Sequence, residues 1–174
     1  NKRYDSRNGC NAIVETATAK IVAGCKNTVI TEGIKEIGTS AFGCAMLQKI
    51  SIPASVTKIH AGAFWGCDFC SSITVDKNNP TYDSRNHCNA IIETATNKLI
   101  TGCLTTHIPS DIVEIGEKAF QSMPMPESFT IPEGIKKIGK SAFSGCKGLV
   151  RVSIPKSIQD IEESAFSSCS LLSE

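Results

Sequence analysis

The sequence has almost no net charge and no long apolar run. Its 174 residues carry 18 basic and 17 acidic side chains, which leaves a formal charge of +1. So little excess charge gives no strong field to attract a nucleic acid or an anionic membrane surface. No apolar run approaches the roughly 20 residues that span a bilayer, and the first residues do not have the pattern of a signal peptide. We therefore expect no nucleic-acid partner and no membrane insertion within this chain.

Common catalytic motifs are also missing from the sequence. The three histidines belong to no His-Glu-x-x-His motif, and there is no Gly-x-Ser-x-Gly motif and no phosphate-binding Gly-rich loop. The triplet Asp-Ser-Arg at 83–85 could be imagined as a site, but Asp and Ser at the head of a loop usually cap backbone donors. The sequence therefore predicts a protein that is not an enzyme, with no catalytic residue, no bound metal and no cofactor.

What the sequence does contain is repetition. Residues 4–25 are identical to residues 82–103 at 16 of 22 positions, at an offset of 78. A shorter unit also recurs, marked by Ala-Phe pairs that are spaced by 22, 56, 23 and 23 residues. Periods of this size are typical of solenoids, in which turns stack because a single turn cannot bury its own apolar face.

The short unit is clearest in "IPEGIKKIGKSAFSGCKGLVRVS" at residues 131–153. The segment that contains Leu149, Val152 and Ile154 ends with the alternation of apolar and polar residues that is typical of a half-buried strand. Pro155 then ends the strand, because proline has no backbone N–H donor. The Ile-x-x-Ile step and the Ala-Phe pair suit a short helical or irregular return segment with Phe pointing inward. One strand per turn follows from this pattern.

The motif IPxxIxxIGxxAFxxCxxL covers residues 30–75 and 108–172. It resembles the BspA-like (Treponema-type) leucine-rich repeats of bacterial surface proteins. The expected fold is therefore α/β, a right-handed leucine-rich-repeat solenoid with one short parallel strand per turn and two inserted β-hairpin turns. We expect one solenoid over 1–174, with hairpin-type turns at about 4–29 and 76–107 and ordinary repeats at about 30–75 and 108–174. Because "NKRYDS" begins inside a pattern that recurs as "NNPTYDS", we also expect a fragment of a longer array.

The two duplicated blocks are interpreted as variant turns that contain a hairpin. In the second block, Ile91 and Ile92 would face Leu99 and Ile100 across a turn near residues 94–97, and Glu93 would form a cross-strand ion pair with Lys98. The spacing after Cys103 matches that of an ordinary repeat, so the last strand of the hairpin is expected to stay in the sheet of repeat strands.

Seven of the nine cysteines fall on core positions of the repeat, where free Cys acts as a small apolar residue. These seven are Cys25, Cys44, Cys67, Cys70, Cys103, Cys146 and Cys169. The repeat therefore also explains the C-x-x-C at residues 67–70, which alone would suggest a redox or metal site. Disulfides Cys10–Cys25 and Cys88–Cys103 across the hairpins remain open possibilities, although an odd total leaves at least one thiol unpaired in a monomer.

Function is expected to come from a surface, since a regular solenoid offers little room for a pocket. Outward side chains next to the core positions of each strand would form a polar, mildly basic stripe on a concave sheet face. The candidate binding residues are Lys26, Asn27, Gln48, Lys49, Ser51, Ser72, Thr74, Thr105, His107, Glu127, Ser128, Arg151 and Ser153. Such a stripe suits an extracellular protein or glycan ligand, whose identity the scaffold motif does not encode.

The family resemblance implies a cell-surface or secreted location and a role in adhesion to host matrix proteins or to other cells. We therefore expect a non-enzymatic protein- or glycan-binding module of a bacterial surface protein. The alternative is a structural spacer in a surface stalk, with no binding of its own. Leu171 and Leu172 at the end of the last repeat also leave end-to-end self-association open.

Overall fold

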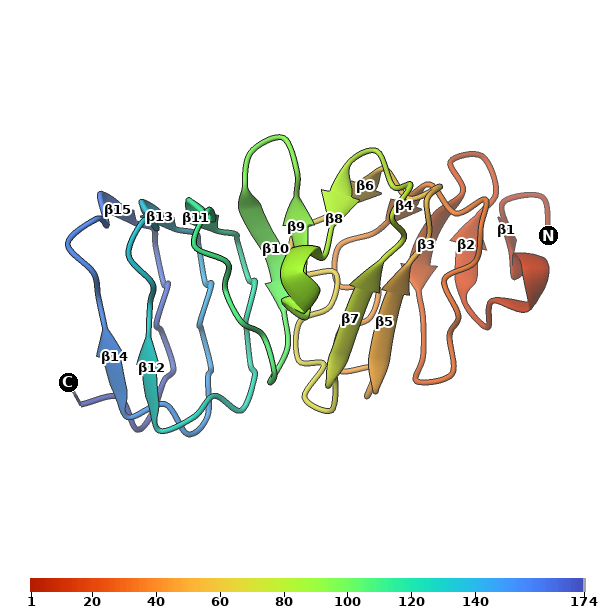
Figure 1. The fold of residues 1–174 in the computed structure, drawn as a ribbon. Helices are drawn as coiled ribbons and strands as arrows, with labels where there is room; N and C mark the ends of the chain where they lie inside the picture. Colours follow the sequence, from red (N-terminus) through yellow and green to blue (C-terminus); the bar gives the residue numbers. More distant parts are fainter. Residues whose placement is uncertain (174) are drawn as a thin grey trace.

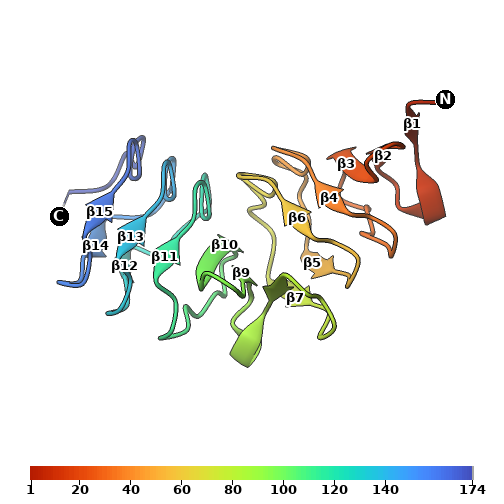
Figure 2. The same cartoon turned by 90° about the horizontal axis from the view of Figure 1, so that it is seen from above.

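The computed structural model describes residues 1–173 and shows a β-solenoid, a row of stacked turns with the two termini at opposite ends (Figure 1). The row curves along its length (Figure 2). Ordinary turns contribute long strands on one side of the stack and short strands on another. The long strands are β5 (Lys49–Ile52), β7 (Ser72–Val75), β12 (Ser128–Thr130) and β14 (Arg151–Ser153). The short strands are β4 (Glu36–Ile37), β6 (Lys58–Ile59), β11 (Glu114–Ile115), β13 (Lys137–Ile138) and β15 (Asp160–Ile161).

Each duplicated block forms three antiparallel strands and one 3-10 turn. The first block contains β1 (Tyr4–Asp5), η1 (Arg7–Gly9), β2 (Ile13–Glu15) and β3 (Lys20–Ala23). The second contains β8 (Tyr82–Asp83), η2 (Arg85–His87), β9 (Ala90–Glu93) and β10 (Lys98–Gly102). The blocks join the short strands into two sheets, of order β1-β2-β3-β4-β6 and β15-β13-β11-β10-β9-β8, whereas the long strands form the separate parallel pairs β5-β7 and β12-β14.

The expected α/β class is wrong in one respect, because residues 1–173 contain no α-helix. The residue before the Ala-Phe pair has a left-handed backbone, with φ of 54° at Ser40 and 55° at Ser141, and a right-handed helix cannot continue through that conformation. The Phe backbone N–H groups instead bond to the next turn, as from Phe42 to the Ala63 carbonyl at 2.8 Å. The fold is a β-solenoid, and the right-handed sense of its coil stays a prediction.

The expected single strand per turn is also wrong, because ordinary turns carry two. The second, short strand comes from the Ile-x-x-Ile step, where Glu36 pairs in parallel with Lys58 and Glu114 with Lys137. Opposite charges alternate along this stack, a favourable cross-strand arrangement. The short return segments therefore form backbone hydrogen bonds with the neighbouring turns, although each strand has only two residues.

The core is a ladder of buried side chains, most clearly the phenylalanines. Phe42 stacks on Phe64 with ring centroids 5.1 Å apart, and Phe143 stacks between Phe120 and Phe166, 5.2 Å from each. The ladder is interrupted at the second hairpin block, which separates two clusters of buried residues. Each fully buried ring of this size contributes about 1.5–3 kcal/mol.

The hairpin prediction is partly confirmed. Ile92 faces Leu99 and Glu93 faces Lys98, as expected, but Ile91 faces Thr101 rather than Ile100, because the register shifts between Leu99 and Thr101. The expected ion pair is wrong, since the Lys98 ammonium lies 2.6 Å from the Glu114 carboxylate of the next turn. The expected strand after Cys103 is also wrong, because residues 103–108 form no strand, and β10, which ends at Gly102, pairs with the short strand β11 rather than with a long strand.

All nine cysteines are free, so neither possible hairpin disulfide is present. Five of the seven predicted core cysteines are buried, as are Cys10 and Cys88. Cys25 and Cys44 are exposed, contrary to expectation. The exposure of Cys44 has a local reason, because its return segment is one residue shorter than the others. Cys44 adopts a left-handed backbone with φ of 55°, which turns its side chain outward.

Candidate binding face

The outward side chains of the four long strands, with the turns that precede them, form what we call the long-strand face. The alternation along β5 sets it up, since Ile50 and Ile52 are buried while Lys49 and Ser51 are exposed. Ser51 and the next turn's Thr74 are in register and their hydroxyls lie 3.4 Å apart. Of the thirteen predicted binding residues, all are exposed except Ser72, which is half-buried.

Four of the predicted residues come together around one hollow at the N-terminal part of this face. The hollow has a volume of 390 Å³ and is lined by Lys26, Asn27, Thr28, Val29, Met46, Leu47, Gln48 and Lys49. Two lysines and two amide residues therefore line the hollow together with the apolar residues Val29, Met46 and Leu47. We call this set the lysine hollow.

A network of hydrogen bonds holds one wall of the lysine hollow. The Thr28 hydroxyl donates to the Asn11 carbonyl at 2.7 Å and accepts the Cys25 backbone N–H at 2.8 Å. The backbone N–H of Asn27 and the Thr28 hydroxyl also lower the pKa of the Cys25 thiol below its ordinary value. Lys26 and its neighbour Asn27 are thus presented on a fixed turn rather than on a strand.

The two lysines of the hollow keep their charge available. Neither Lys26 nor Lys49 has an ion pair within residues 1–173. Lysine presents three donors on a flexible stem, so a pair of them suits carboxylate, sulfate or hydroxyl oxygens on a ligand. The arrangement can bind by charge and hydrogen bonds, with Val29 and Met46, which are 60% and 54% exposed, for apolar contact.

The C-terminal part of the face is more neutral. Arg151 and Glu127 form an ion pair at 3.2 Å between β14 and the residue before β12, and the remaining candidates there, Ser128 and Ser153, are small hydroxyl residues. An exposed pair of this kind adds little stability. This end therefore offers hydrogen-bonding groups without a net charge.

The middle of the predicted stripe is interrupted, which corrects the expected continuous face. Residues 103–106 form a turn, in which the Thr106 hydroxyl accepts the Cys103 N–H at 2.7 Å and donates to the Asn89 carbonyl at 2.5 Å. Thr105 donates to the Ser71 carbonyl at 2.9 Å, and His107 lies beyond the turn. These two candidate residues do not join a strand.

Sequence reasoning missed Met46 as part of the hollow. Its signal was the return segment "FGCAMLQ", which is one residue shorter between Phe42 and Leu47 than its equivalents. The shorter loop is accommodated by left-handed backbone at Cys44 and Met46, both with φ of 55°, which places Met46 outside. The hollow exists because this turn is irregular.

The C-x-x-C at residues 67–70 is part of the core. Cys67 is 1% exposed and Cys70 is 0% exposed, and burial raises the pKa of Cys67 to about 12. The described part of the chain has no group of three or more His, Cys, Asp or Glu side chains arranged to hold a metal ion. Within the same residues, no helix has the length and apolar character needed to cross a membrane.

Comparison with solved structures agrees with the fold. The crystal structure of the pneumococcal vaccine antigen PcpA superposes with a TM-score of 0.61 at 23% identity, over 71% of this chain and 31% of that one. A leucine-rich repeat protein from Eubacterium ventriosum gives a TM-score of 0.53 at 22% identity, over 79% of this chain and 32% of that one. The chain thus spans about a third of the length of these two proteins.

Sequence comparisons address the family directly. No curated protein matches the sequence. The family model described as "BspA type Leucine rich repeat region" matches six copies, over residues 12–101 and 100–174. Because these ranges include nearly all of the repeats, this chain belongs to the BspA-type leucine-rich repeat family.

Proposed function

We propose that this chain is a non-enzymatic recognition module of a bacterial cell-surface or secreted protein, and that it binds an extracellular protein or glycan through the long-strand face. The observation that carries the proposal is the lysine hollow, where Lys26 and Lys49 lie beside Asn27 and Gln48 without an acidic partner among residues 1–173. Two unneutralised cations around a hollow favour a ligand with anionic or hydroxyl oxygens. A role in adhesion would follow from binding of this kind.

The location is supported by the kinds of protein that share the fold. One is named as a pneumococcal vaccine antigen, and a vaccine antigen is normally accessible from outside the cell. The family match adds a repeat scaffold, which supplies an extended surface for contact rather than a catalytic pocket. A net charge of +1 makes the lysine hollow a local feature of an almost neutral chain.

Binding to immobilised extracellular matrix proteins and mucin-type glycans tests the proposal. The informative variant is Lys26→Ala with Lys49→Ala, and the matched control is Lys77→Ala with Lys136→Ala, two exposed lysines that also lack an ion pair among the described side chains. We expect the first pair to raise the dissociation constant at least about tenfold and the control pair to leave it unchanged, with circular dichroism showing the same fold.

Salt dependence provides a second readout. Binding through the two lysines should weaken as salt rises, because surface charges are screened over about 10 Å at 0.1 M ionic strength. Binding that survives the double substitution would place the site elsewhere. An absence of binding to every ligand on the panel would favour the alternative role as a structural spacer.

A further inference from the structure

The backbone of β5 forms a ladder on one edge only. β5 pairs in parallel with β7 and with no other strand among residues 1–173. The carbonyls of Gln48 and Ile52 accept N–H groups from the turn that contains β7, at 3.0 and 2.8 Å. Alternate residues of a strand direct their backbone groups to opposite edges. The backbone groups of Lys49 and Ser51 therefore face away from β7.

The segment that lies beside this second edge does not pair with it. Residues 28–30 line a cavity together with β5, but Thr28 and Val29 donate their N–H groups to carbonyls of the first duplicated block, at 2.9 and 3.0 Å. No hydrogen bond joins the backbones of residues 26–30 and 48–52 in the described chain. We call the N–H and carbonyl groups of Lys49 and Ser51 the open edge of β5.

The other outer edge of the same strand pair is covered. At β7, the Ile73 N–H donates to the Asn89 side-chain oxygen at 3.3 Å, and the Ile73 carbonyl accepts the Ser84 hydroxyl at 3.1 Å. An uncovered strand edge is a site at which another strand can pair, and proteins commonly protect such edges. Side chains of the second block protect β7, whereas the open edge of β5 has no such cover within residues 1–173.

The open edge borders the lysine hollow. A smaller cavity of 70 Å³ shares Thr28, Val29, Leu47 and Lys49 with the hollow and extends along β5 to Ser51. Its other lining residues are Ile30, Phe42 and Ile50, so its walls are largely apolar. Side chains of an extended chain alternate between two faces. A chain that lies along β5 would thus direct one set of side chains to this cavity and the other set outward.

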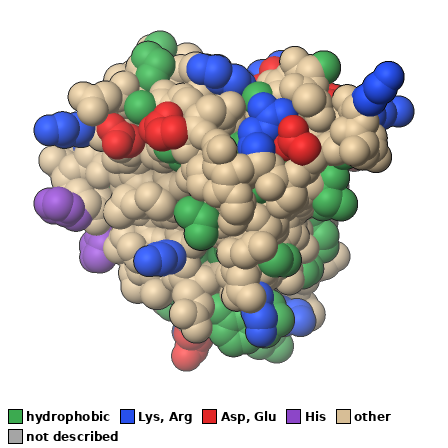
Figure 3. All heavy atoms as spheres, turned by 90° about the vertical axis from the view of Figure 1, so that its right-hand side faces the viewer, with side chains coloured by type: hydrophobic (Ala, Val, Ile, Leu, Met, Phe, Trp, Pro, Cys, Tyr) green, Lys and Arg blue, Asp and Glu red, His purple; other side chains and the backbone are tan. Residues whose placement is uncertain are grey.

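The charge beside the open edge favours acidic side chains in the outward set. Neither Lys26 nor Lys49 has an ion pair within residues 1–173. Viewed from the side of the N-terminal turns, the surface is mostly uncharged, with separate charged side chains and small apolar patches (Figure 3). Carboxylates on alternate residues of an extended chain would lie on the same side as the Lys49 ammonium group and accept its hydrogen bonds.

We propose that the open edge of β5 binds an extended segment of a partner protein by strand addition, and that this segment alternates acidic and apolar residues. The proposal rests on the function proposed above, because it names the ligand class of the same hollow. Main-chain bonds to Lys49 and Ser51 provide affinity, and the lysines and the smaller cavity select the side chains. A glycan cannot form this ladder, because it has no peptide N–H groups.

A synthetic hexapeptide that alternates Asp and Val is the probe, and fluorescence anisotropy measures its dissociation constant. Two further peptides carry N-methyl groups on either the Asp or the Val residues, because only one set of N–H groups faces β5. We expect one methylated peptide to bind at least about tenfold more weakly than the other. Loss with methylated Asp indicates an antiparallel segment, and loss with methylated Val a parallel one. Equal affinities of the two methylated peptides would overturn the proposal.

Substitution of Ser51 tests the same contact from the protein side. Ser51→Pro removes an N–H of the open edge and keeps the bonds to β7, since proline is tolerated where a strand N–H faces solvent. It should raise the dissociation constant of the probe at least about tenfold, whereas Ser51→Ala keeps the N–H and should change it by less than about twofold. The matched control is Thr130→Pro in β12, where Ile131 bonds to β14 and Thr130 therefore faces away from it. This control should leave binding unchanged, with circular dichroism showing each variant folded.

The outcomes separate this inference from the proposed function. If the probe does not bind while a matrix protein or glycan binds through Lys26 and Lys49, the inference is wrong and the proposed function stands. If neither binds, both are wrong. Light scattering tests for a second copy at the edge: we expect a monomer, and a dimer that Ser51→Pro abolishes would show that the chain pairs with itself and would overturn the proposal.

Discussion

The two duplicated blocks have nearly the same sequence and the same local fold, yet their surroundings differ. Both form a hairpin with a 3-10 turn, and Asn8 and Asn86 have the same left-handed backbone, with φ of 55° and 56°. The first block has one open side, and the second lies between two sets of turns (Figure 1). The sequence of a block therefore determines its shape, while its neighbours determine which side chains are buried.

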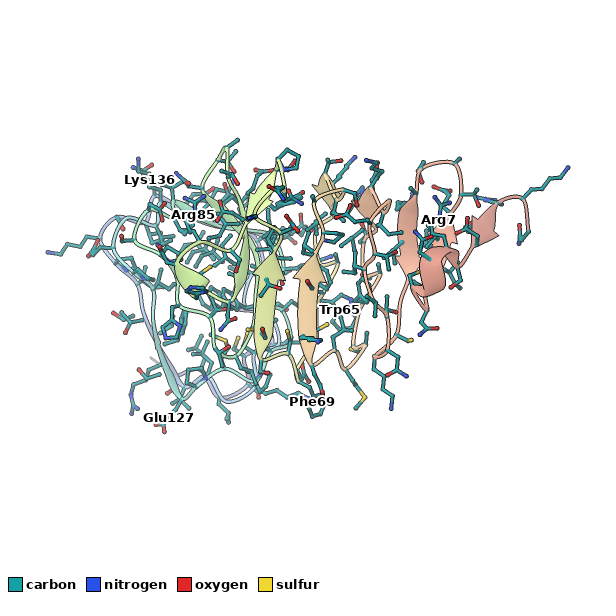
Figure 4. All side chains as sticks on the ribbon, turned by 45° about the vertical axis from the view of Figure 1, so that its right-hand side comes forward. Arg7, Trp65, Phe69, Arg85, Glu127 and Lys136 are labelled. Atoms are coloured by element: carbon teal, nitrogen blue, oxygen red, sulfur yellow. The ribbon has the colours of Figure 1, made fainter. Side chains whose placement is uncertain are left out.

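The equivalent arginines show this contrast most directly (Figure 4). Arg7 bonds within its own block, to Asp5 at 2.8 Å. Arg85 makes the same contact with Asp83 and also bonds to Asn97 at 2.9 Å and to Asp111 at 2.5 Å. One guanidinium braces a loop, and the other also ties the block to the following turn.

The largest expected difference between the blocks is in thiol reactivity. Cys25 should alkylate faster than Cys103 by on the order of a hundredfold or more, because a buried thiol reacts only after local opening. Hydrogen bonds lower the pKa of both, from the Asn27 N–H to Cys25 and from the Cys70 thiol to Cys103, so accessibility distinguishes them. Mass spectrometry of peptides after timed labelling measures the rates.

Denaturation provides the control for that experiment. Both cysteines should label at similar rates in urea, and Cys25→Ser should remove the fast-reacting peptide. Equal rates in the native protein would mean that the second block opens readily and that the comparison of burial does not hold in solution.

A smaller effect is expected from adding a methyl group where each block packs on the phenylalanine ladder. A Cβ on Gly102 would lie 2.2 Å from a ring carbon of Phe120, and one on Gly24 would lie 2.1 Å from a ring carbon of Phe42. Overpacking of this kind costs about 1–3 kcal/mol of unfolding free energy. We expect Gly102→Ala to cost more, because its Cβ would also lie 2.9 Å from the Thr106 hydroxyl oxygen and the Phe120 ring also packs against Phe129.

Urea denaturation measures both glycine variants, and Thr39→Ala at an exposed position should leave the unfolding free energy unchanged. A larger loss for Gly24→Ala would show that the open end of the solenoid is less able to relax than its middle. That result would contradict the view that the neighbours of the second block restrict it.

Substitution of Arg85 and of Arg7 should give a smaller difference in unfolding free energy between the two blocks. Arg85→Ala is expected to lower the unfolding free energy by about 1–2 kcal/mol, since charge-assisted hydrogen bonds are strong but this side chain is partly exposed. Arg7→Ala should have a smaller effect because it lacks the link to the next turn. If the link matters, Arg85→Ala should cost less in an Asp111→Ala background, and equal costs in both backgrounds would show that the Asp111 contact adds nothing.

The core and the repeats could be predicted from the sequence because their signal is periodic. The same apolar residue types recur at the same spacing, and stacking places like on like, as with Phe120 and Phe143. The second strand of each turn was not predicted, because a two-residue strand such as β4 has no alternation to detect. Its pairing depends on the neighbouring turn rather than on local pattern.

In the hairpins and in the candidate site, residue spacing alone did not predict the structure. The spacing after Cys103 matches a repeat strand, but the Thr106 hydroxyl bonds to two backbone groups and stabilises a turn there instead. In the site, Lys26 and Lys49 were predicted as exposed, but their meeting around one hollow depends on the irregular backbone at Met46. Sequence identity between the blocks also conceals that Ile13 and Ile91 differ in burial, since only the neighbouring turn determines it.

The smallest expected difference between the blocks is in how their aspartates make stability depend on pH in the acidic range. Burial alone would raise the pKa of Asp83, but hydrogen bonds from Arg85 and Thr94 outweigh it and lower the pKa below its ordinary value of 3.8. Because the folded pKa is depressed, the stability that Asp83 contributes is fully present above about pH 4 and is lost as pH falls through the folded pKa. The pKa of Asp5 is lowered chiefly by its hydrogen bond to Arg7, so the sign is the same there.

Unfolding measured from about pH 5 to about pH 2 compares the two carboxylates. Wild-type stability should fall more steeply below about pH 4 than that of Asp83→Asn, because the variant has no carboxylate to protonate at this site. Asp5→Asn should flatten the profile less, since Asp5 lies in an open block. Glu162 and Glu163, whose pKa values are lowered by Lys137 and Lys140, provide the same background slope in every variant. Superimposable profiles for wild type and Asp83→Asn would show that the Asp83–Arg85 pair, although better connected than its counterpart, does not contribute to stability.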